Sequence, residues 1–193
     1  MFKLNKYLML SLLSATILNG CAVLAVGAVA VVAGATTVVV TDPRHSGTVI
    51  DDNTIATKIQ SNISEDFPDS NIYVTCYNGV VLLSGQASTQ KAKDGATFDA
   101  KTQPGVTQIY NYLDVRLPQS ISSRTDDSFT TTQIKTKLLS LKDVNSNNVK
   151  IVTTNSVVYL MGIVTKTNAN AIADAAAHVN GVTKVVTLFE YTS

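Results

Sequence analysis

A pattern of alternating apolar and polar positions occurs twice in this chain, at residues 71–89 and again at residues 148–166. The two segments align without a gap, and they share Asn71/Asn148, Asn78/Asn155, Val80/Val157, Val81/Val158, Leu83/Leu160 and Gly85/Gly162. Alternation with a period of two is typical of β-strands that bury one face. The Asn-Gly and Asn-Ser pairs between the strands favour a tight two-residue hairpin. The chain therefore contains a duplicated unit.

Helical patterns precede and follow each hairpin. The first helices carry apolar stripes at helical spacing, which comprise Ile55, Ile59 and Ile63 in the first unit and Ile134, Leu138 and Leu141 in the second. Asp52 is a favourable N-cap residue, so we expect the first helix to begin directly after it. Second helices are predicted at about residues 89–103 and 166–179, and closing strands at residues 108–115 and 184–191.

The predicted order in both units is helix, strand, strand, helix, strand, which makes an α+β fold with the helices on one face of a small sheet. The first unit spans residues 51–117 and the second spans residues 126–193, separated by a Ser-rich linker without periodicity at residues 118–125. Each unit is near the lower size limit for a single hydrophobic core. Pairing of the two units would relieve that weakness.

The N-terminus has the features of an export signal. Two lysines precede an apolar run at residues 7–18, which ends in the sequence LNGC with the cysteine at Cys21. This ending resembles the bacterial lipobox, so residues 1–20 are predicted to be a lipoprotein signal peptide and Cys21 an acylated N-terminus. The following residue is Ala22, not Asp, which implies forwarding to the outer membrane. The alternative is an ordinary signal anchor with an incidental cysteine.

A second apolar run covers residues 22–40 and contains no charged side chain. It is just long enough to cross a bilayer as a helix. Its composition of Ala, Gly, Val and Thr is less hydrophobic than a typical membrane span and forms a weaker helix. We therefore interpret residues 21–50 as a lipidated cysteine followed by an apolar tether, and the membrane-spanning helix remains the alternative.

Several motifs together carry a resemblance to a known family. A glycine ends each hairpin at Gly85 and Gly162, a Gly-Val pair precedes each last strand, and the sequences TDPR and GTxxDD lead into the first unit at residues 41–52. Each unit resembles the BON domain. Two such units behind a lipobox resemble the outer-membrane lipoproteins that carry two BON domains. The resemblance implies two tandem αββαβ domains, each a three-stranded mixed sheet packed against two helices.

The same resemblance implies a function. Members of this family are non-enzymatic lipoproteins that face the periplasm, bind anionic phospholipids through the second domain, gather at division sites and support outer-membrane integrity. The expected partners are phosphatidylglycerol and cardiolipin. Charge agrees with this assignment, because residues 51–117 hold five basic and eight acidic side chains whereas residues 125–193 hold six basic and five acidic ones. The second unit is thus better suited to an anionic surface.

The first helix of the second unit carries the candidate lipid contact. Phe129 projects away from the apolar stripe, with Lys135 and Lys137 to either side, and the family has an aromatic residue in the corresponding region. The resemblance therefore assigns phospholipid binding to Phe129, Lys135, Lys137 and Leu139. The first unit has Thr54 at the aligned position.

A structural alternative exists for Phe129. Thr130 and Gln133 have the spacing of a capping box at a helix start, and Phe129 would then pack on Ile134 as a hydrophobic staple. The two roles do not exclude each other.

Candidate chemistry elsewhere is sparse. His45 and His178 are the only histidines and lack partners at metal-ligand spacing, so no metal or cofactor is expected, and His178 is interpreted as a helix C-terminal residue. Cys76 falls on the inward side of a strand and is predicted to be a core residue, with a reactive thiol as the alternative. No nucleophile or phosphate-loop signature is present. Neither an enzyme nor a nucleic-acid-binding protein is indicated.

A second functional class stays open. The chain could act as an adaptor for envelope assembly proteins or cell-wall enzymes, with the lipid anchor providing location only. Four tyrosines of the first unit are candidates for an aromatic contact surface, namely Tyr73, Tyr77, Tyr110 and Tyr112. Tyr73 is expected on the outward face, which makes it the candidate protein contact.

Overall fold

The computed structural model describes residue 44 and residues 46–118, 121–142 and 144–192. All of them belong to one compact unit, Val40–Ser193. The predicted signal peptide, Cys21 and the apolar run at residues 22–40 lie outside the described residues. Within the described part, no helix has both the length and the apolar character required to cross a membrane.

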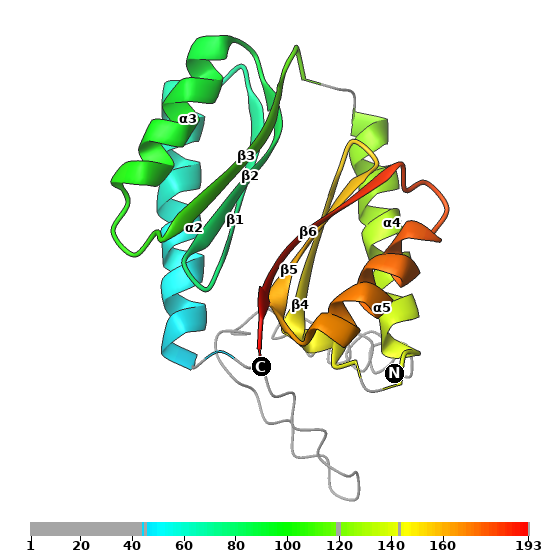
Figure 1. Cartoon of the computed structure of the whole chain (residues 1–193). Helices are drawn as coiled ribbons and strands as arrows, with labels where there is room; N and C mark the ends of the chain where they lie inside the picture. Colours follow the sequence, from blue (N-terminus) through cyan, green and yellow to red (C-terminus); the bar gives the residue numbers. More distant parts are fainter. Residues whose placement is uncertain (1–43, 45, 119–120, 143, 193) are drawn as a thin grey trace, which may run out of the picture. The chain divides into compact units, whose positions relative to one another are not determined.

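The first copy of the repeat folds as helix, hairpin, helix and strand (Figure 1). Its elements are α2 (Ser46–Asp66), β1 (Asn71–Tyr77), β2 (Val80–Ala87), α3 (Gln90–Thr102) and β3 (Gln108–Val115). The strand order is β1-β2-β3, with β1 antiparallel and β3 parallel to β2. Both helices cover the same face of this sheet.

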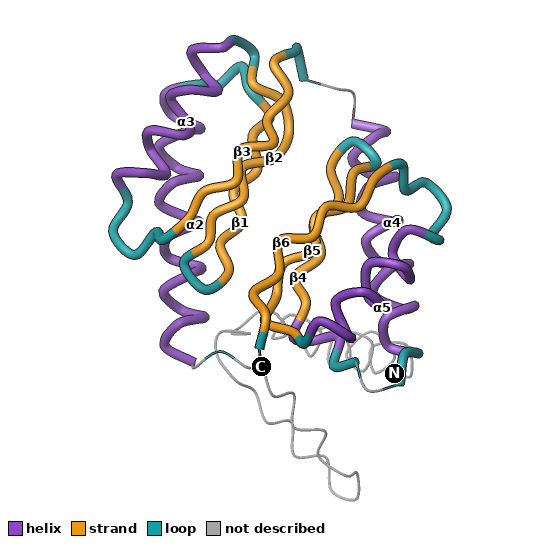
Figure 2. Tube along the Cα trace, in the orientation of Figure 1, coloured by secondary structure: helices purple, strands orange, loops and turns teal. Residues whose placement is uncertain are grey.

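The second copy repeats this topology, as the distribution of helix and strand in Figure 2 shows. Its elements are α4 (Ile121–Leu139), a short 3-10 helix η2 (Ser146–Asn148), β4 (Val149–Thr154), β5 (Val157–Val164), α5 (Lys166–Ala177) and β6 (Lys184–Tyr191). The strand order is β4-β5-β6, with the same antiparallel and parallel pairings. The predicted α+β fold with two mixed three-stranded sheets is confirmed.

The two hairpin turns have the backbone conformation that their sequences predict. Asn78 and Gly79 have φ values of 53° and 75°, and Asn155 and Ser156 have values of 54° and 62°. Two consecutive positive φ angles define the turn whose twist matches that of the flanking strands. Asn tolerates this conformation because its short polar side chain bonds locally. The register of each hairpin therefore follows from its own turn residues.

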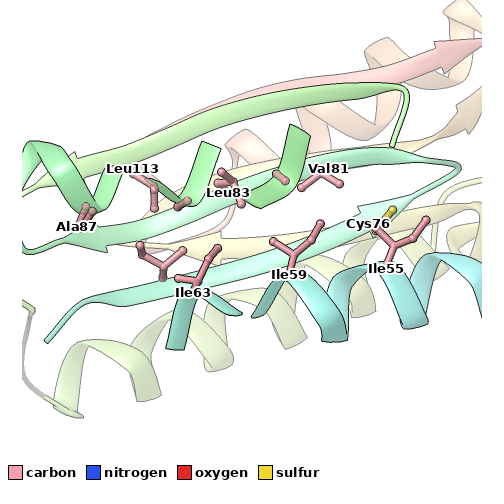
Figure 3. Packing of buried hydrophobic residues seen from close by; sticks show 12 residues of the cluster. Ile55, Ile59, Ile63, Cys76, Val81, Leu83, Ala87 and Leu113 are labelled. Carbon is pink, nitrogen blue, oxygen red and sulfur yellow. The ribbon is translucent and has the colours of Figure 1, made fainter. Parts of the chain in front are cut away.

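Each copy encloses its own hydrophobic core between the helices and the sheet. In the first copy the isoleucine stripe of α2 meets Val81, Leu83 and Leu113 of the sheet, as Figure 3 shows. The second copy packs Ile134 and Leu138 of α4 against Leu160 of β5 in the same way, with Leu141 at the margin. The predicted core stripes of both first helices are confirmed.

A third core buries the sheet faces that point away from the helices. It contains residues from both copies, namely Tyr77, Val80, Leu82, Tyr159, Met161 and Leu188. Hydrogen bonds surround it, including Gln86 Nε2 to Asn155 Oδ1 at 2.7 Å and Thr154 Oγ1 to Ser84 Oγ at 3.2 Å. Because both faces of each sheet are covered, β2 and most of β5 are buried along their length.

The starts of two helices differ from the sequence-based expectation. α2 begins at Ser46 and α4 begins at Ile121, so Asp52 is not an N-cap and the predicted linker is helical from residue 121 onward. These first turns lack an apolar stripe, which is why periodicity did not reveal them. Hydroxyl side chains near these helix starts bond back to helix carbonyls, as in Thr54 to Ile50 and Ser128 to Arg124, and so remain compatible with helix.

Candidate functional site on helix α4

Phe129 is an exposed aromatic residue in the middle of a helix. Its side chain is 64% exposed. Because α4 begins eight residues earlier at Ile121, Thr130 cannot cap the helix, and the predicted capping box and staple are wrong. Thr130 is instead buried, and its hydroxyl lies against Gly181 in the loop before β6. Because Thr130 is buried and Phe129 is exposed, this part of α4 directs Thr130 toward the protein and Phe129 toward solvent.

A second apolar side chain is exposed at the C-terminal end of the same helix. Leu139 is 67% exposed. It lies ten residues after Phe129, which corresponds to about 15 Å along the helix axis. At about 100° per residue, the two side chains project within about 80° of each other, on the half of the helix opposite Ile134 and Leu138. α4 thus presents two apolar groups to solvent and two to the core.

The two candidate lysines lie on opposite flanks of this outer face. Lys137 Nζ donates to the carbonyl of His178, the C-cap residue of α5, at 3.4 Å. Lys135 is exposed on the other flank, one helical turn after Thr131, whose hydroxyl bonds Thr153 of β4. Neither lysine belongs to the ion pairs formed between described residues, which are Arg44–Asp52, Arg116–Asp114 and His178–Asp174. Their positive charges are therefore not neutralised by neighbouring carboxylates in the described part of the chain.

The first copy does not reproduce this surface. The positions on α2 that match Phe129, Lys137 and Leu139 are occupied by Thr54, Asn62 and Ser64. The hydroxyl of Thr54 is bonded to the carbonyl of Ile50 within the helix. Since the two helices occupy equivalent places in the fold, the exposed pair Phe129 and Leu139 has no apolar counterpart at the matching positions of α2.

The paired aspartates of the repeat have a structural role that sequence reasoning missed. Asp52 is only 2% exposed, and its carboxylate accepts hydrogen bonds from the backbone of Asn78 at 2.6 Å and Gly79 at 2.8 Å. In the second copy, Asp127 bonds the backbone of Asn155 and Ser156 at 2.8 and 2.9 Å. Each aspartate thus ties the first helix to the hairpin turn. The presence of Asp at matching positions of both copies was the sequence feature that could have indicated this shared role.

Arg44 completes this arrangement in the first copy. Its Nη1 donates to Asp52 Oδ2 at 2.6 Å, and its guanidinium lies 3.9 Å from the centre of the Tyr77 ring. The Tyr77 hydroxyl donates in turn to the carbonyl of Asn148 in the second copy. The last residues of the tether are therefore held against the first copy at the place where both copies meet.

Cys76 is a core residue, as predicted. It is 7% exposed, and its thiol donates to Asp52 Oδ1 at 3.2 Å. Burial, and then the neighbouring Asp52 carboxylate, raise the pKa of the Cys76 thiol to about 12. A thiol with this pKa supplies almost no thiolate near neutral pH, and the thiolate is the reactive form. The alternative of a reactive cysteine is therefore not supported.

The four tyrosines do not form one exposed surface. Tyr77 is buried in the core shared by the copies and Tyr110 packs against it. Tyr112 lies 6.5 Å from Tyr110 and 5.1 Å from Tyr159, measured between ring centroids. Tyr73 is 37% exposed on the sheet face that points away from the helices, as expected, and lines a groove together with residues of the second copy. Most of the tyrosine side chains of the first copy therefore pack against the second copy.

Metal-ligand clusters are not found in the described part of the chain. No group of three or more His, Cys, Asp or Glu side chains there is placed to hold a metal ion. His178 is the C-cap of α5 and its Nδ1 contacts the carbonyl of Asp174 at 2.8 Å, consistent with its expected place at a helix end. His45 lies outside the described residues.

Comparison with known proteins agrees with the duplication seen in the fold. The family model of the BON domain matches twice, at residues 51–116 and 126–193. The chain is 40% identical over 184 residues to the outer membrane lipoprotein DolP of Haemophilus influenzae, covering 93% of both chains. It is 38% identical over 153 residues to the 21 kDa hemolysin of Actinobacillus pleuropneumoniae, covering 78% of this chain and 79% of that protein.

A more distant relative also aligns over most of its own length and most of this chain. The chain is 33% identical over 144 residues to the osmotically inducible protein Y of Escherichia coli, covering 72% of each chain.

Proposed function

Because the chain belongs to the BON domain family, we propose that it is a non-enzymatic lipoprotein of the outer membrane that binds anionic phospholipid through the outer face of α4. The single observation that carries this proposal is the exposure of Phe129 and Leu139 on one helix, at 64% and 67%. Side chains of this kind lose contact with water when they enter a lipid interface. The lipids expected are phosphatidylglycerol and cardiolipin.

The lysines support the same assignment. Lys135 and Lys137 flank the apolar residues and form no ion pair among the described residues. A basic side chain near an anionic membrane surface contributes about 1 kcal/mol. Two lysines together with two apolar anchors give a weak and salt-sensitive contact, which suits a domain that is also held near the membrane by an N-terminal anchor.

The location and wider role rest on similarity. A relative that is 40% identical over 93% of the chain is described as an outer membrane lipoprotein. Together with the lipobox-like sequence at Cys21, this supports acylation of Cys21 and attachment to the outer membrane, with the BON domains facing the periplasm. In that location, phospholipid binding would support outer-membrane integrity, with the division site as the expected place of action.

The test is flotation of residues 42–193, which omits the acyl anchor, with liposomes. Vesicles of zwitterionic lipid alone are compared with vesicles containing phosphatidylglycerol or cardiolipin, at low and high salt. Flotation with the anionic vesicles only, lost at high salt, is the expected result. Flotation with none of the vesicles would overturn the proposal.

Two variants map the contact. Phe129→Ala combined with Lys135→Glu is expected to abolish flotation while the circular dichroism spectrum remains unchanged. The matched control is Phe98→Ala. Phe98 is 66% exposed on α3 of the first copy, so this substitution removes an equally exposed aromatic ring from another helix. Equal losses in both variants would assign the effect to general hydrophobicity and not to α4.

The adaptor function remains a second candidate because Tyr73 is 37% exposed on the face of β1 that points away from the helices. A photocrosslinker at Tyr73 would capture an envelope assembly protein in intact cells if this function is correct. Loss of that product in a variant that still floats with anionic vesicles would favour the adaptor over the lipid-binding function.

A further inference from the structure

One side chain closes the free edge of β1. Gln60 of α2 donates from Nε2 to the carbonyl of Ile72 at 3.0 Å and accepts through Oε1 from the backbone N–H of Val74 at 3.0 Å. β1 is an outer strand of its sheet, and the unpaired backbone groups of such a strand are a template for another strand. Gln60 therefore occupies one C=O and one N–H group that an incoming strand would need.

The equivalent edge of β4 lacks this closure. Gln60 follows the core residue Ile59, and in the second copy the core residue Ile134 is followed by Lys135. A lysine side chain has no acceptor, so it cannot bond a backbone N–H. Within the described part of α4, Lys135 makes neither a side-chain hydrogen bond nor an ion pair.

The hairpin register identifies the backbone groups left at this edge. Thr154 pairs with Val157 across a two-residue turn, so Thr154 and every second residue before it bond to β5. Ile151 and Thr153 consequently direct their N–H and C=O groups to the outer edge. The side chain of Thr131 reaches Thr153, but its 2.7 Å bond is to the Thr153 hydroxyl and does not involve the Thr153 backbone.

A groove gives access to this edge. It has a volume of about 310 Å³ and lies between the two copies. One wall consists of Val152, Thr153 and Thr154 of β4 with Arg124, Asp127, Ser128 and Thr131 of α4, and the other wall comes from the first copy and includes Gln60, Tyr73 and Val74. On α4, Arg124, Ser128, Thr131 and Lys135 follow one another at helical spacing and form one stripe beside the strand, the edge stripe. Its two central side chains are small hydroxyl groups and its two ends are basic.

The charges around the groove select the kind of strand that fits. Arg124, Lys135 and the exposed Lys150 of β4 form no ion pair among the described residues. One carboxylate, Asp127, also lines the groove, and its two oxygens accept from the backbone N–H groups of Asn155 and Ser156. The basic side chains around the edge therefore outnumber this one acid. Like charges facing one another across paired strands are destabilising. The edge therefore disfavours the β4 strand of a second copy and favours a strand with carboxylates.

We propose that the free edge of β4 binds an extended acidic segment of another protein, which pairs with Ile151 and Thr153 as a fourth strand of the second sheet. Main-chain hydrogen bonds supply the affinity in this mode of recognition, and side chains at alternate positions supply the selectivity. The proposal goes beyond phospholipid binding and does not rest on it. The two surfaces share Lys135 and otherwise use different residues.

The test uses the full-length chain in neutral detergent micelles and hydrogen–deuterium exchange. The probe is a short blocked peptide of sequence Thr-Val-Glu-Val-Glu-Val-Thr, compared with the same peptide carrying Lys in place of Glu. In the free protein, the amides of Ile151 and Thr153 are expected to exchange faster than that of Val74. Added acidic peptide slows exchange at Ile151 and Thr153 and leaves Val74 unchanged, whereas the lysine peptide has no effect.

Two variants close the edge in different ways. Lys135→Gln introduces the side chain that seals β1 in the first copy, and Ile151→Pro removes one outward N–H without changing charge, a substitution that edge strands accept. Each is expected to weaken peptide binding at least about tenfold, which corresponds to the loss of one or two backbone hydrogen bonds. Phe129→Ala is expected to bind the peptide normally and Ile151→Pro to float normally with anionic vesicles, which separates this proposal from lipid binding.

Three results would overturn the proposal. One is unchanged exchange at Ile151 and Thr153 with the acidic peptide at millimolar concentration. Another is equal protection by the lysine peptide. A third is protection of these amides without peptide, together with a doubled mass of the protein in the micelle, which would make a second copy the occupant. The reciprocal variant Gln60→Lys supplies a positive control, since it should open β1 and accelerate exchange at Val74.

Discussion

The guanidinium of Arg44 donates a 2.6 Å hydrogen bond to the carboxylate of Asp52, and both side chains are largely buried. The same carboxylate holds the backbone of the hairpin turn at Asn78 and Gly79. One acidic side chain therefore joins the end of the tether, the first helix and the turn between two strands. The geometry of the first copy depends on it.

Replacement of Asp52 by alanine is expected to destabilise the fold. The change leaves Arg44 without its carboxylate partner and two backbone N–H groups of the turn without an acceptor, and loss of one partner from a buried ion pair costs about 3 kcal/mol. Urea denaturation of residues 42–193 measures the loss. Asp51→Ala is the matched control, because Asp51 is exposed. Equal stability of both variants would contradict the assigned role.

Leu82 provides a test of the core shared by the two copies. It is completely buried against residues of both sheets. Leu82→Ala is expected to lower the free energy of unfolding by about 3 kcal/mol. Because the lost contacts join the copies, we expect hydrogen exchange to accelerate at Tyr159 and Met161 as well as in the first copy. Acceleration confined to the first copy would show that the shared core does not couple them.

Gly85 is required by a close approach of two strands. Its φ is +110°, and a Cβ at this position would lie 2.1 Å from the carbonyl oxygen of Asn71. Gly85→Ala is therefore expected to cost more than about 2 kcal/mol, because β1 must move to relieve the clash. Thermal unfolding measures the loss of stability relative to the control Gly47→Ala. At Gly47 no atom lies within 4 Å of the added Cβ. A Gly85→Ala protein as stable as this control would refute the geometry.

The Cys76 thiol predicts a dependence of stability on alkaline pH. Its pKa is raised in the folded protein from an ordinary value of 9.0 to about 12. Between these values the unfolded chain releases a proton that the folded protein retains, so the free energy of unfolding falls as pH rises above 9. Urea denaturation from pH 8 to 11 should show that the free energy of unfolding declines less for Cys76→Ala than for the unsubstituted residues 42–193. A Cys76→Ala protein with the same decline would exclude this thiol as the cause.

Local chemistry explains the features that were predicted correctly. The residues of the two turns tolerate positive φ, so the hairpins formed at Asn78 and Asn155 as expected. The isoleucine stripe from Ile55 to Ile63 has the spacing of one helix face, and all of its members are buried. Each of these features depends on residues that are close together in the chain, which is why a single sequence reveals them.

The candidate site was predicted only in part. Phe129 and its lysines were named from the amphipathic pattern and the family resemblance, and the structure places the ring on an exposed face. The start of α4 at Ile121 was missed because its first turns carry no apolar stripe. That extension removes the capping role of Thr130 and turns Phe129 into a residue of the helix middle.

The sequence by itself determined the duplication, the order of helices and strands in each copy, and the residues that face each internal core, because periodicity and turn chemistry are local properties. Only the tertiary structure showed that Tyr77 and Tyr159 share one core, that Asp52 holds a turn 26 residues away, and that Gln60 closes a strand edge that Lys135 leaves open. These relationships join residues distant in the chain. No local pattern records them, because burial and hydrogen bonding between such residues arise only when the elements pack.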